Sequence, residues 1–174
     1  METSEAVELI RGGVARTGGA WADLGAGSGT FTLALAELLG PGGSVYAVDA
    51  RPDVLAVKAR PGGARVVPLV ADFTEPLPFE NLDGVLMSNS LHFVESDAQA
   101  AVLKGCAQLL RQGGALILVE YDQVRGNPWV PHPVPPARFR ELTVGVGLGQ
   151  LRAIGRRRSR YGPKDIYAVV ARRE

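Results

Sequence analysis

The apolar residues of this chain fall into short runs separated by turns rich in Gly and Pro. Continuous runs bounded by such turns are typical of buried strands, and apolar residues at helical spacing are typical of helices packed on a sheet. The first pattern predicts strands over 20–24, 44–48, 65–71, 82–87 and 115–121. The second predicts helices over 4–16, 30–39, 52–60, 96–111 and 137–146. Strands that alternate with helices indicate an α/β fold with a mainly parallel sheet covered on both faces.

Two more strands are expected near the end of the chain, over 150–160 and 166–172, around a turn at Gly162-Pro163. Strands joined by so short a turn run antiparallel to each other. Within the helix predicted over 96–111, Ser96 and Gln99 have the spacing of a capping box, and Gly113-Gly114 is expected to end the helix.

Composition narrows the class of protein. A chain of 174 residues with 46% hydrophobic and 21% charged residues is expected to form one globular domain, 1–174, and not a disordered segment. Nineteen basic and eighteen acidic residues nearly cancel, which argues against a general polyanion binder. The single cysteine, Cys106, excludes an internal disulfide. Neither a secretory signal nor an apolar run of membrane-spanning length is evident, so a cytoplasmic protein without membrane contact is expected.

The candidate chemistry stands where the predicted strands end. Open α/β sheets bind ligands beyond the carboxyl ends of their strands. The first strand runs into the turn Asp23-Leu-Gly-Ala-Gly-Ser-Gly29, the second ends at Asp49, and the third is followed by Asp72 and Phe73. The glycine pattern departs from the dinucleotide fingerprint, because its sixth position is Thr30 and not Gly, so a nicotinamide dehydrogenase is the weakest hypothesis. No Cys/His cluster has metal-ligand spacing, so no metal is predicted.

In this order the motifs resemble those of the class I S-adenosylmethionine-dependent methyltransferases. The resemblance rests on Asp-Leu-Gly-Ala-Gly-Ser-Gly, Val-Tyr-Ala-Val-Asp, Val-Ala-Asp-Phe and Leu-Asp-Gly-Val-Leu-Met-Ser-Asn-Ser-Leu-His-Phe, and it spans about residues 20 to 121. It implies a Rossmann-like, seven-stranded, mostly parallel sheet with an antiparallel last strand and helices on both faces. It also implies a transferase whose cofactor is S-adenosyl-L-methionine.

The resemblance assigns roles to the residues at the strand ends. Gly25, Ala26 and Gly27 would pass close to the methionine moiety and ribose of the cofactor, with Gly29 in the same turn. Asp23 would orient this turn or face the cofactor's ammonium group. Asp49 would bind the ribose hydroxyls beside Ala50 and Arg51, whereas Asp72 and Phe73 would bind the adenine. Ser88, Asn89 and Ser90 would lie under the sulfonium and border the acceptor.

Methyl transfer is an in-line displacement that depends mainly on alignment and desolvation, so a general base is needed only where the acceptor loses a proton before attack. Asn89 and His92 are the catalytic candidates. The alternative for His92 is a plain polar residue between Leu91 and Phe93. Asn89 lacks the Asn/Asp-Pro-Pro-Tyr/Phe signature of amino-methylating enzymes that act on nucleic acids, which favours a small-molecule acceptor.

Other functions stay open at this point. RNA or protein methylation is one, with the arginines of 152–160 as a docking surface; the alternative for those arginines is a solvated sheet edge. A methyltransferase-like protein that binds the cofactor without catalysis is another. A homo-oligomer is equally compatible with the sequence. The acceptor pocket is expected to be walled by the N-terminal helix and by 122–148, including Trp129, His132 and Phe139.

Overall fold

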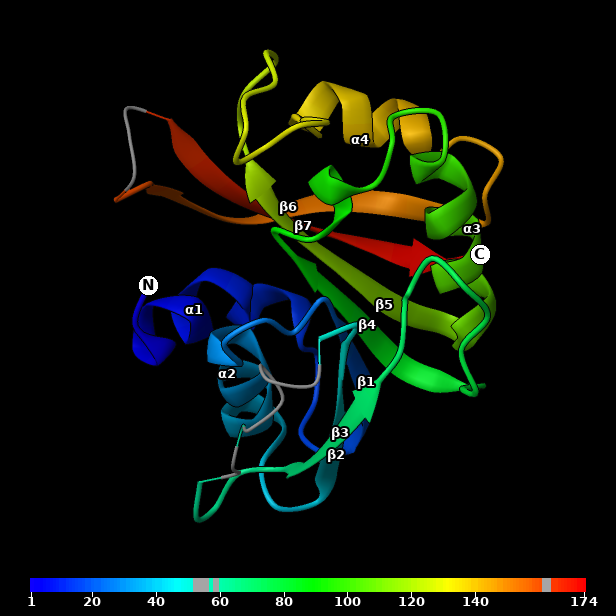
Figure 1. Ribbon diagram of the computed structural model, residues 1–174. Coiled ribbons are helices and arrows are strands. Elements are labelled where there is room, and N and C mark those ends of the chain that lie inside the picture. Colours follow the sequence, from blue (N-terminus) through cyan, green and yellow to red (C-terminus); the bar gives the residue numbers. More distant parts are fainter. Residues whose placement is uncertain (52–56, 58–59, 161–163) are drawn as a thin grey trace.

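The computed structural model describes residues 1–51, 57, 60–160 and 164–174 (Figure 1). Helices and strands alternate through the first part of the chain, and two long strands end it. The helical elements are α1 (Thr3–Ile10), η1 (Arg11–Gly13), α2 (Thr30–Leu39), η3 (Leu91–Phe93), α3 (Gln99–Leu109) and α4 (Pro136–Leu142). The strands are β1 (Gly19–Leu24), β2 (Gly43–Asp49), β3 (Arg65–Val70), β4 (Leu82–Ser88), β5 (Leu110–Tyr121), β6 (Leu148–Arg158) and β7 (Asp165–Arg173).

The strands form one seven-stranded sheet in the order β3-β2-β1-β4-β5-β7-β6. The pairs among β3, β2, β1, β4 and β5 are parallel, whereas β7 is antiparallel to both of its neighbours. The predicted fold class, a mostly parallel sheet whose last strand is antiparallel, is therefore confirmed. The chain adds β2 and β3 on one side of β1 and then returns to add β4 on the other side, which places β1 and β4 side by side near the centre of the sheet.

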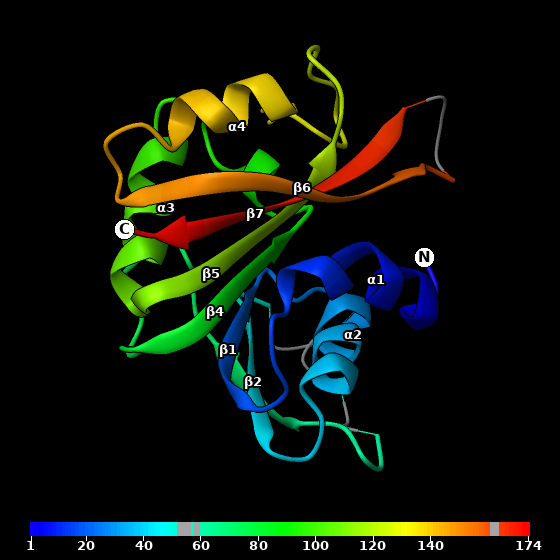
Figure 2. The ribbon, with the colours of Figure 1, turned by 180° about the vertical axis from the view of Figure 1, so that it is seen from behind.

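Helices cover both faces of this sheet (Figures 1 and 2). One hydrophobic cluster joins α1 and α2 to one face through Ile10, Leu35 and Ile117. A second joins α3 and α4 to the other face through Leu103, Phe139 and Leu118. Leu118 and Ile117 are adjacent in β5 and point to opposite faces of the sheet. Both are fully buried because helices cover both faces. This two-sided burial explains why the central strands read as continuous apolar runs.

The predicted start of α3 is wrong. The helix begins at Gln99, its N-cap is Ala98, and no side chain caps it. Gln99 instead donates from its side-chain nitrogen to the backbone oxygens of Val94 and His132, at 3.3 and 2.9 Å. Capping-box spacing depends only on residues that are close in sequence. Here the Gln99 side chain that a capping box requires bonds instead to the loop over 122–135.

The predicted boundary between α3 and β5 is also wrong. Gly113-Gly114 does not follow the helix; it lies inside β5, which begins at Leu110. The pairing with β4 shifts between Leu82 and Gly84, and Gly113 has a φ of +70°, a value that residues with a Cβ rarely adopt. The two glycines therefore allow an irregularity within a strand, and Leu110 belongs to the strand and not to the apolar face of the helix.

The helix predicted over 52–60 and the turn at Gly162-Pro163 lie outside the described residues. In the described part of the chain, no helix is both long and apolar enough to cross a membrane.

Candidate active site

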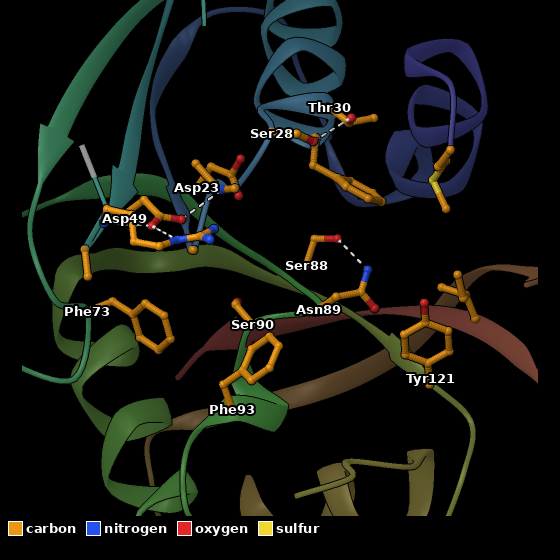
Figure 3. Close-up of a pocket in the computed structure, with 18 of the residues that line it drawn as sticks. Asp23, Ser28, Thr30, Asp49, Phe73, Ser88, Asn89, Ser90, Phe93 and Tyr121 are labelled. Carbon is orange, nitrogen blue, oxygen red and sulfur yellow. Dashed lines mark hydrogen bonds and ion pairs between the residues drawn. The ribbon is translucent and has the colours of Figure 1, made fainter. Parts of the chain in front are cut away.

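A cavity of about 650 Å³ opens at the carboxyl ends of the parallel strands. Its wall follows the order of the strands in the sheet, from the segment after β3 to the hairpin of β6 and β7. Figure 3 shows Asp49 and Phe73 on one side of Ser88 and Asn89, with Tyr121 on the other. The lining residues are Met1, Asp23, Gly25, Ala26, Gly27, Ser28, Thr30, Phe31, Asp49, Ala50, Arg51, Asp72, Phe73, Ser88, Asn89, Ser90, Phe93, Tyr121, Arg157, Arg158, Arg160 and Ile166.

The turn after β1 is built around backbone that has no room for a side chain. Gly25 has a φ of +79°, and a Cβ placed on it would lie 2.5 Å from the Cβ of Ser90. The backbone N–H groups of Gly25 and Ala26 both donate to the Val48 carbonyl, at 2.9 and 3.0 Å. The turn is thereby fixed against the ends of β2 and β4, with exposed backbone along the cavity, and this is an arrangement that a ligand can approach closely.

Asp49 holds the end of β2 to this turn. Its Oδ2 accepts the Gly27 N–H at 2.9 Å, and its Oδ1 accepts the Arg51 N–H at 3.0 Å. Asp49 is 8% exposed and lines the cavity. A carboxylate has about four acceptor positions, so after these two bonds Asp49 can still accept from a pair of ligand hydroxyls.

Asp23 is the most unusual group of the site. It is fully buried, and Thr32 Oγ1 donates to its Oδ2 at 2.6 Å, whereas its Oδ1 has no hydrogen-bond partner among the described residues. Burial raises the pKa of this carboxyl to about 7, because the charged form is poorly solvated there and Asp49 adds negative charge. A buried acid with an unpartnered oxygen at the cavity wall is suited to receive a cationic group.

Asp72 and Phe73 form the end of the cavity beside β3. Asp72 Oδ1 accepts from the backbone N–H and the hydroxyl of Thr74, at 2.9 and 2.7 Å. These bonds hold the irregular segment after β3 in place, while Phe73 turns its ring toward the cavity (Figure 3). An acidic group next to an aromatic face can hold a flat heterocycle that bears an amino group.

The end of β4 forms the middle of the floor. Asn89 has a φ of +51°, in the left-handed region, where Asn is better tolerated than most residues with a side chain. Its backbone N–H donates to the Val119 carbonyl at 2.8 Å, and its buried Oδ1 has no partner in the described part of the chain. Ser90 donates its hydroxyl to the Leu24 carbonyl at 2.7 Å, which ties this turn to β1. Asn89 thus lines the cavity and carries a buried amide oxygen without a partner among the described residues.

Twelve of the predicted site residues line the cavity together. They are Asp23, Gly25, Ala26, Gly27, Asp49, Ala50, Arg51, Asp72, Phe73, Ser88, Asn89 and Ser90. Gly29 does not line it; with a φ of +80°, Gly29 is the N-cap of α2. The structure thus brings together predicted residues from four strand ends that the chain separates widely.

His92 also lies outside the cavity lining. Its side chain is 2% exposed, and its Nδ1 is 2.6 Å from Glu120 Oε2, which is itself fully buried. The same carboxylate accepts the His92 backbone N–H at 3.2 Å. This arrangement ties η3 to β5 behind the cavity wall and favours the alternative reading of His92 as a structural polar residue.

The segments expected to wall the acceptor pocket, the helix over 4–16 and residues 122–148, do not line this cavity. Phe139 is 1% exposed and belongs to the core under α4, whereas Trp129 is 83% exposed on its loop. His132 contacts Glu95 at 3.2 Å. None of the three is among the described residues that line the cavity.

Sequence reasoning missed the residues that take their place. These are Met1, Phe31, Phe93, Tyr121, Arg157, Arg158, Arg160 and Ile166. The register across β5, β7 and β6 brings several of them together, since Tyr121 pairs with Ile166 and Ile166 with Arg157. Only the pairing of the last hairpin with β5 shows this. A cluster of three or more metal-ligating side chains is absent from the described residues.

Comparison with known proteins agrees with this geometry. A family model described as a methyltransferase domain matches residues 22–114, more than half of the chain. No curated protein matches the sequence.

Solved structures match the whole fold. One is a methyltransferase of the S-adenosylmethionine-dependent class from Methanosarcina mazei, with 18% identity and a TM-score of 0.70, over 94% of this chain and 96% of that one. Another is the 1,6-didemethyltoxoflavin-N1-methyltransferase of Burkholderia thailandensis with its substrate and S-adenosylhomocysteine bound, with 21% identity and a TM-score of 0.76, over 98% and 77% of the two chains. A third is the magnesium protoporphyrin IX methyltransferase of Synechocystis PCC 6803 with S-adenosylmethionine bound, with 17% identity and a TM-score of 0.68, over 99% and 78%.

The predicted family, enzyme class and cofactor are therefore confirmed. The family model covers the turn after β1, the ends of β2, β3 and β4, and helix α3. Most of these elements contribute lining residues to the cavity. The chain belongs to the methyltransferase domain family and is a class I S-adenosylmethionine-dependent methyltransferase.

Proposed function

We propose that this cavity binds S-adenosylmethionine along the ends of β3, β2, β1 and β4, and that the enzyme methylates a small-molecule acceptor held beyond β4. The observation that carries the proposal is the row of lining residues itself, in which Asp72, Asp49, Asp23 and Asn89 follow one another in the order of the strands. The bound cofactor supplies a methyl group on a sulfonium, which is a good leaving group for in-line displacement.

The residues fit this cofactor group by group. Phe73 and Asp72 can hold the adenine, and the free acceptor positions of Asp49 suit the two ribose hydroxyls. The unpartnered Oδ1 of Asp23 can accept from the ammonium of the methionine moiety. The backbone of Gly25 and Gly27 leaves room for the ligand at the turn between these groups.

The part of the cavity next to Asn89 is left for the acceptor. Asn89 Oδ1 is buried and unpartnered in the described structure, so it can accept a hydrogen bond from the reacting group and orient its lone pair toward the methyl carbon. Phe31, Phe93 and Tyr121 line the same cavity, so an acceptor packed against them would displace water. The burial of His92 away from the cavity supports catalysis by alignment, with no histidine base.

A small acceptor is supported by the size and lining of the site. A volume of about 650 Å³ is within the usual range for small-molecule sites, and aromatic side chains line its acceptor end. The toxoflavin precursor and the magnesium porphyrin of the structural neighbours are small molecules too.

The alternative of RNA docking on the arginines of 152–160 is less well supported. Arg152 donates to the Gly12 carbonyl, Arg156 pairs with Asp122 and Asp165, and Arg157 and Arg160 pair with Glu5. Arginines with such partners are less available for phosphates.

The cofactor assignment is tested by calorimetry with S-adenosylhomocysteine. We expect Asp49→Asn to weaken binding at least about tenfold, because a carboxylate that accepts from two hydroxyls is worth more than about 1.4 kcal/mol over an amide. Asp97→Asn, an exposed acidic residue after η3, is the matched control. Unchanged affinity in the Asp49 variant would remove the proposed ribose contact.

The acceptor assignment is tested by incubating the enzyme with methyl-labelled S-adenosylmethionine and a cell extract divided into small molecules, RNA and protein. The label is expected in the small-molecule fraction. Label confined to RNA or protein would overturn the proposed acceptor class.

A further inference from the structure

The two ends of the cavity carry opposite charge. At the β3–β2 end the titratable lining residues are Asp72 and Asp49, together with Arg51, whose Nε is 3.5 Å from Asp49. At the β7–β6 end they are Arg157, Arg158 and Arg160, and no acidic residue of the described chain lines the cavity there. In the proposed function the cofactor takes the acidic end, so the basic end faces the acceptor.

Two of the three arginines at the basic end share one carboxylate, whose single negative charge offsets one of their two positive charges. Arg157 and Arg160 each donate from Nη2 to Glu5 Oε1 at 2.8 Å. The Arg157 hydrogen bond, together with the Glu2 N–H and Arg160, lowers the pKa of Glu5 to about 2, so Glu5 stays ionised at any neutral pH. These bonds link the end of β6 to α1 and fix where the hairpin stands beside the cavity.

Arg158 is different. Its side chain is exposed at the cavity wall, and no partner of its guanidinium is found among the described residues. The acidic groups around it are occupied, because Asp122 and Asp165 both pair with Arg156, at 2.5 and 2.8 Å, and Glu5 holds the other two arginines. Among the described lining residues, this end of the cavity therefore has an excess of positive charge, and the forked guanidinium of Arg158 suits a carboxylate or a phosphate.

Apolar side chains that line the same cavity define the rest of the ligand. Tyr121 and Ile166 pair across β5 and β7 and line the cavity together with Arg158. Phe93 is 63% exposed although it lines the same cavity, which leaves an aromatic face to be covered. We infer that the acceptor of this methyltransferase is an aromatic small molecule that bears an anionic group, a carboxylate or a phosphate, which the guanidinium of Arg158 binds. This inference rests on the proposed function.

The test compares three probes on the full chain saturated with S-adenosylhomocysteine. They are 4-hydroxybenzoate, phenyl phosphate and the neutral 4-hydroxybenzamide, and their binding is followed by calorimetry or by ligand-observed NMR. We expect at least one anion to bind about tenfold or more tightly than the amide, and we expect that preference to weaken as salt is raised. Which of the two anions binds better identifies the group.

Variants assign the preference to one side chain. Arg158→Gln is expected to abolish the preference for the anion, Arg158→Lys to retain part of it, and Arg140→Gln, at an exposed arginine of α4 outside the cavity, to leave it unchanged. Equal binding of anion and amide, no binding of any probe, or a preference that survives Arg158→Gln would each overturn the inference. Binding of S-adenosylhomocysteine is measured first in every sample, so its loss would contradict the cofactor site and not the acceptor class.

Discussion

At the scale of single residues, Asp23 shows how burial produces a functional group. A carboxyl group with an ordinary environment is ionised at neutral pH, but here burial raises its pKa to about 7. Thr32 donates to one oxygen, and the other oxygen is buried without a hydrogen-bond partner among the described residues. The cofactor's ammonium group would supply the missing charge partner.

The first prediction concerns the pH dependence of cofactor binding. In the free protein Asp23 must lose its proton to pair with an ammonium, so affinity for S-adenosylhomocysteine rises with pH between 5.5 and 7.5 and is about tenfold lower one pH unit below a pKa of about 7. Calorimetry across this range measures it. Asp23→Asn is expected to bind weakly with no such slope, and a flat profile for the unmodified protein would contradict the role of Asp23.

The folding stability of the protein without ligand is expected to depend on pH in the opposite direction, and to fall as Asp23 loses its proton. The folded-state pKa of Asp23 lies above the unfolded value of about 3.8, so the folded state holds its proton more tightly. The contribution of Asp23 to stability is therefore largest below pH 3.8 and falls as pH rises to about 7. Asn has no proton to lose in this pH range, so the Asp23→Asn variant does not lose stability in this way as pH rises. The melting temperature of the variant at pH 8 without ligand is expected to equal or exceed that of the parent chain.

At the scale of elements, the contact between α1 and β6 connects the first and last parts of the chain. Glu5 of α1 accepts from Arg157 and Arg160, and the Gly12 carbonyl accepts from Arg152. These bonds join segments separated by about 140 to 155 residues in sequence. They hold the basic end of the cavity beside the helix that covers it.

The second prediction is that Glu5→Gln loosens this contact. The pKa of Glu5 is lowered from 4.5 to about 2, so the ionised carboxylate stabilises the folded state. This contribution to folding stability is fully present above pH 4.5 and is lost as pH falls through about 2. Hydrogen exchange in 157–158 should therefore be faster in the variant at pH 7. Glu8→Gln, which breaks an exposed pair with Arg11 on the same helix, is the control and should exchange as the parent does. Equal exchange in both variants would show that the pair has no role in holding the hairpin.

The same scale shows where sequence patterns fail. The spacing of Ser96 and Gln99 fits a capping box, but Gln99 bonds to the 122–135 loop instead. Gly113-Gly114 fits a helix stop, but it lies within β5, where the strand pairing is irregular. Both patterns are local, and in both cases a partner far along the chain determined the outcome.

At the scale of the whole molecule, the cavity is a property of the sheet and not of any one segment. Its lining comes from the ends of β1, β2, β4, β5, β6 and β7 and from the segment after β3. A ligand in this cavity would therefore contact elements whose relative positions exist only in the folded state. Binding and folding should be strongly linked.

The third prediction follows from this linkage. S-adenosylhomocysteine at a concentration 100 times its Kd should stabilise the fold by about 2.7 kcal/mol. For a chain of this size that corresponds to a rise in melting temperature of about 5–10 °C. Thermal unfolding with and without ligand measures it, and Asp49→Asn at the same ligand concentration should show a much smaller rise. An equal rise in both proteins would place the ligand elsewhere.

The sequence by itself determined the fold class and the end of the cavity that is proposed for the cofactor. Strand runs, helical spacing and acidic residues at successive strand ends are local features, and the parallel topology places all those ends at one edge of the sheet. Asp49, Asp72 and the turn from Asp23 were therefore predictable before any contact was known.

Only the tertiary structure decided the acceptor end. Tyr121, Ile166 and Arg157 meet through the register of β5, β7 and β6, and Glu5 pairs with two of the arginines. Register and ion pairing are relations between distant segments, and spacing along the chain does not encode them. For this reason Trp129, His132 and Phe139 were expected at the acceptor pocket, whereas the residues that line the end of the cavity proposed for the acceptor include Tyr121, Phe93 and Arg158.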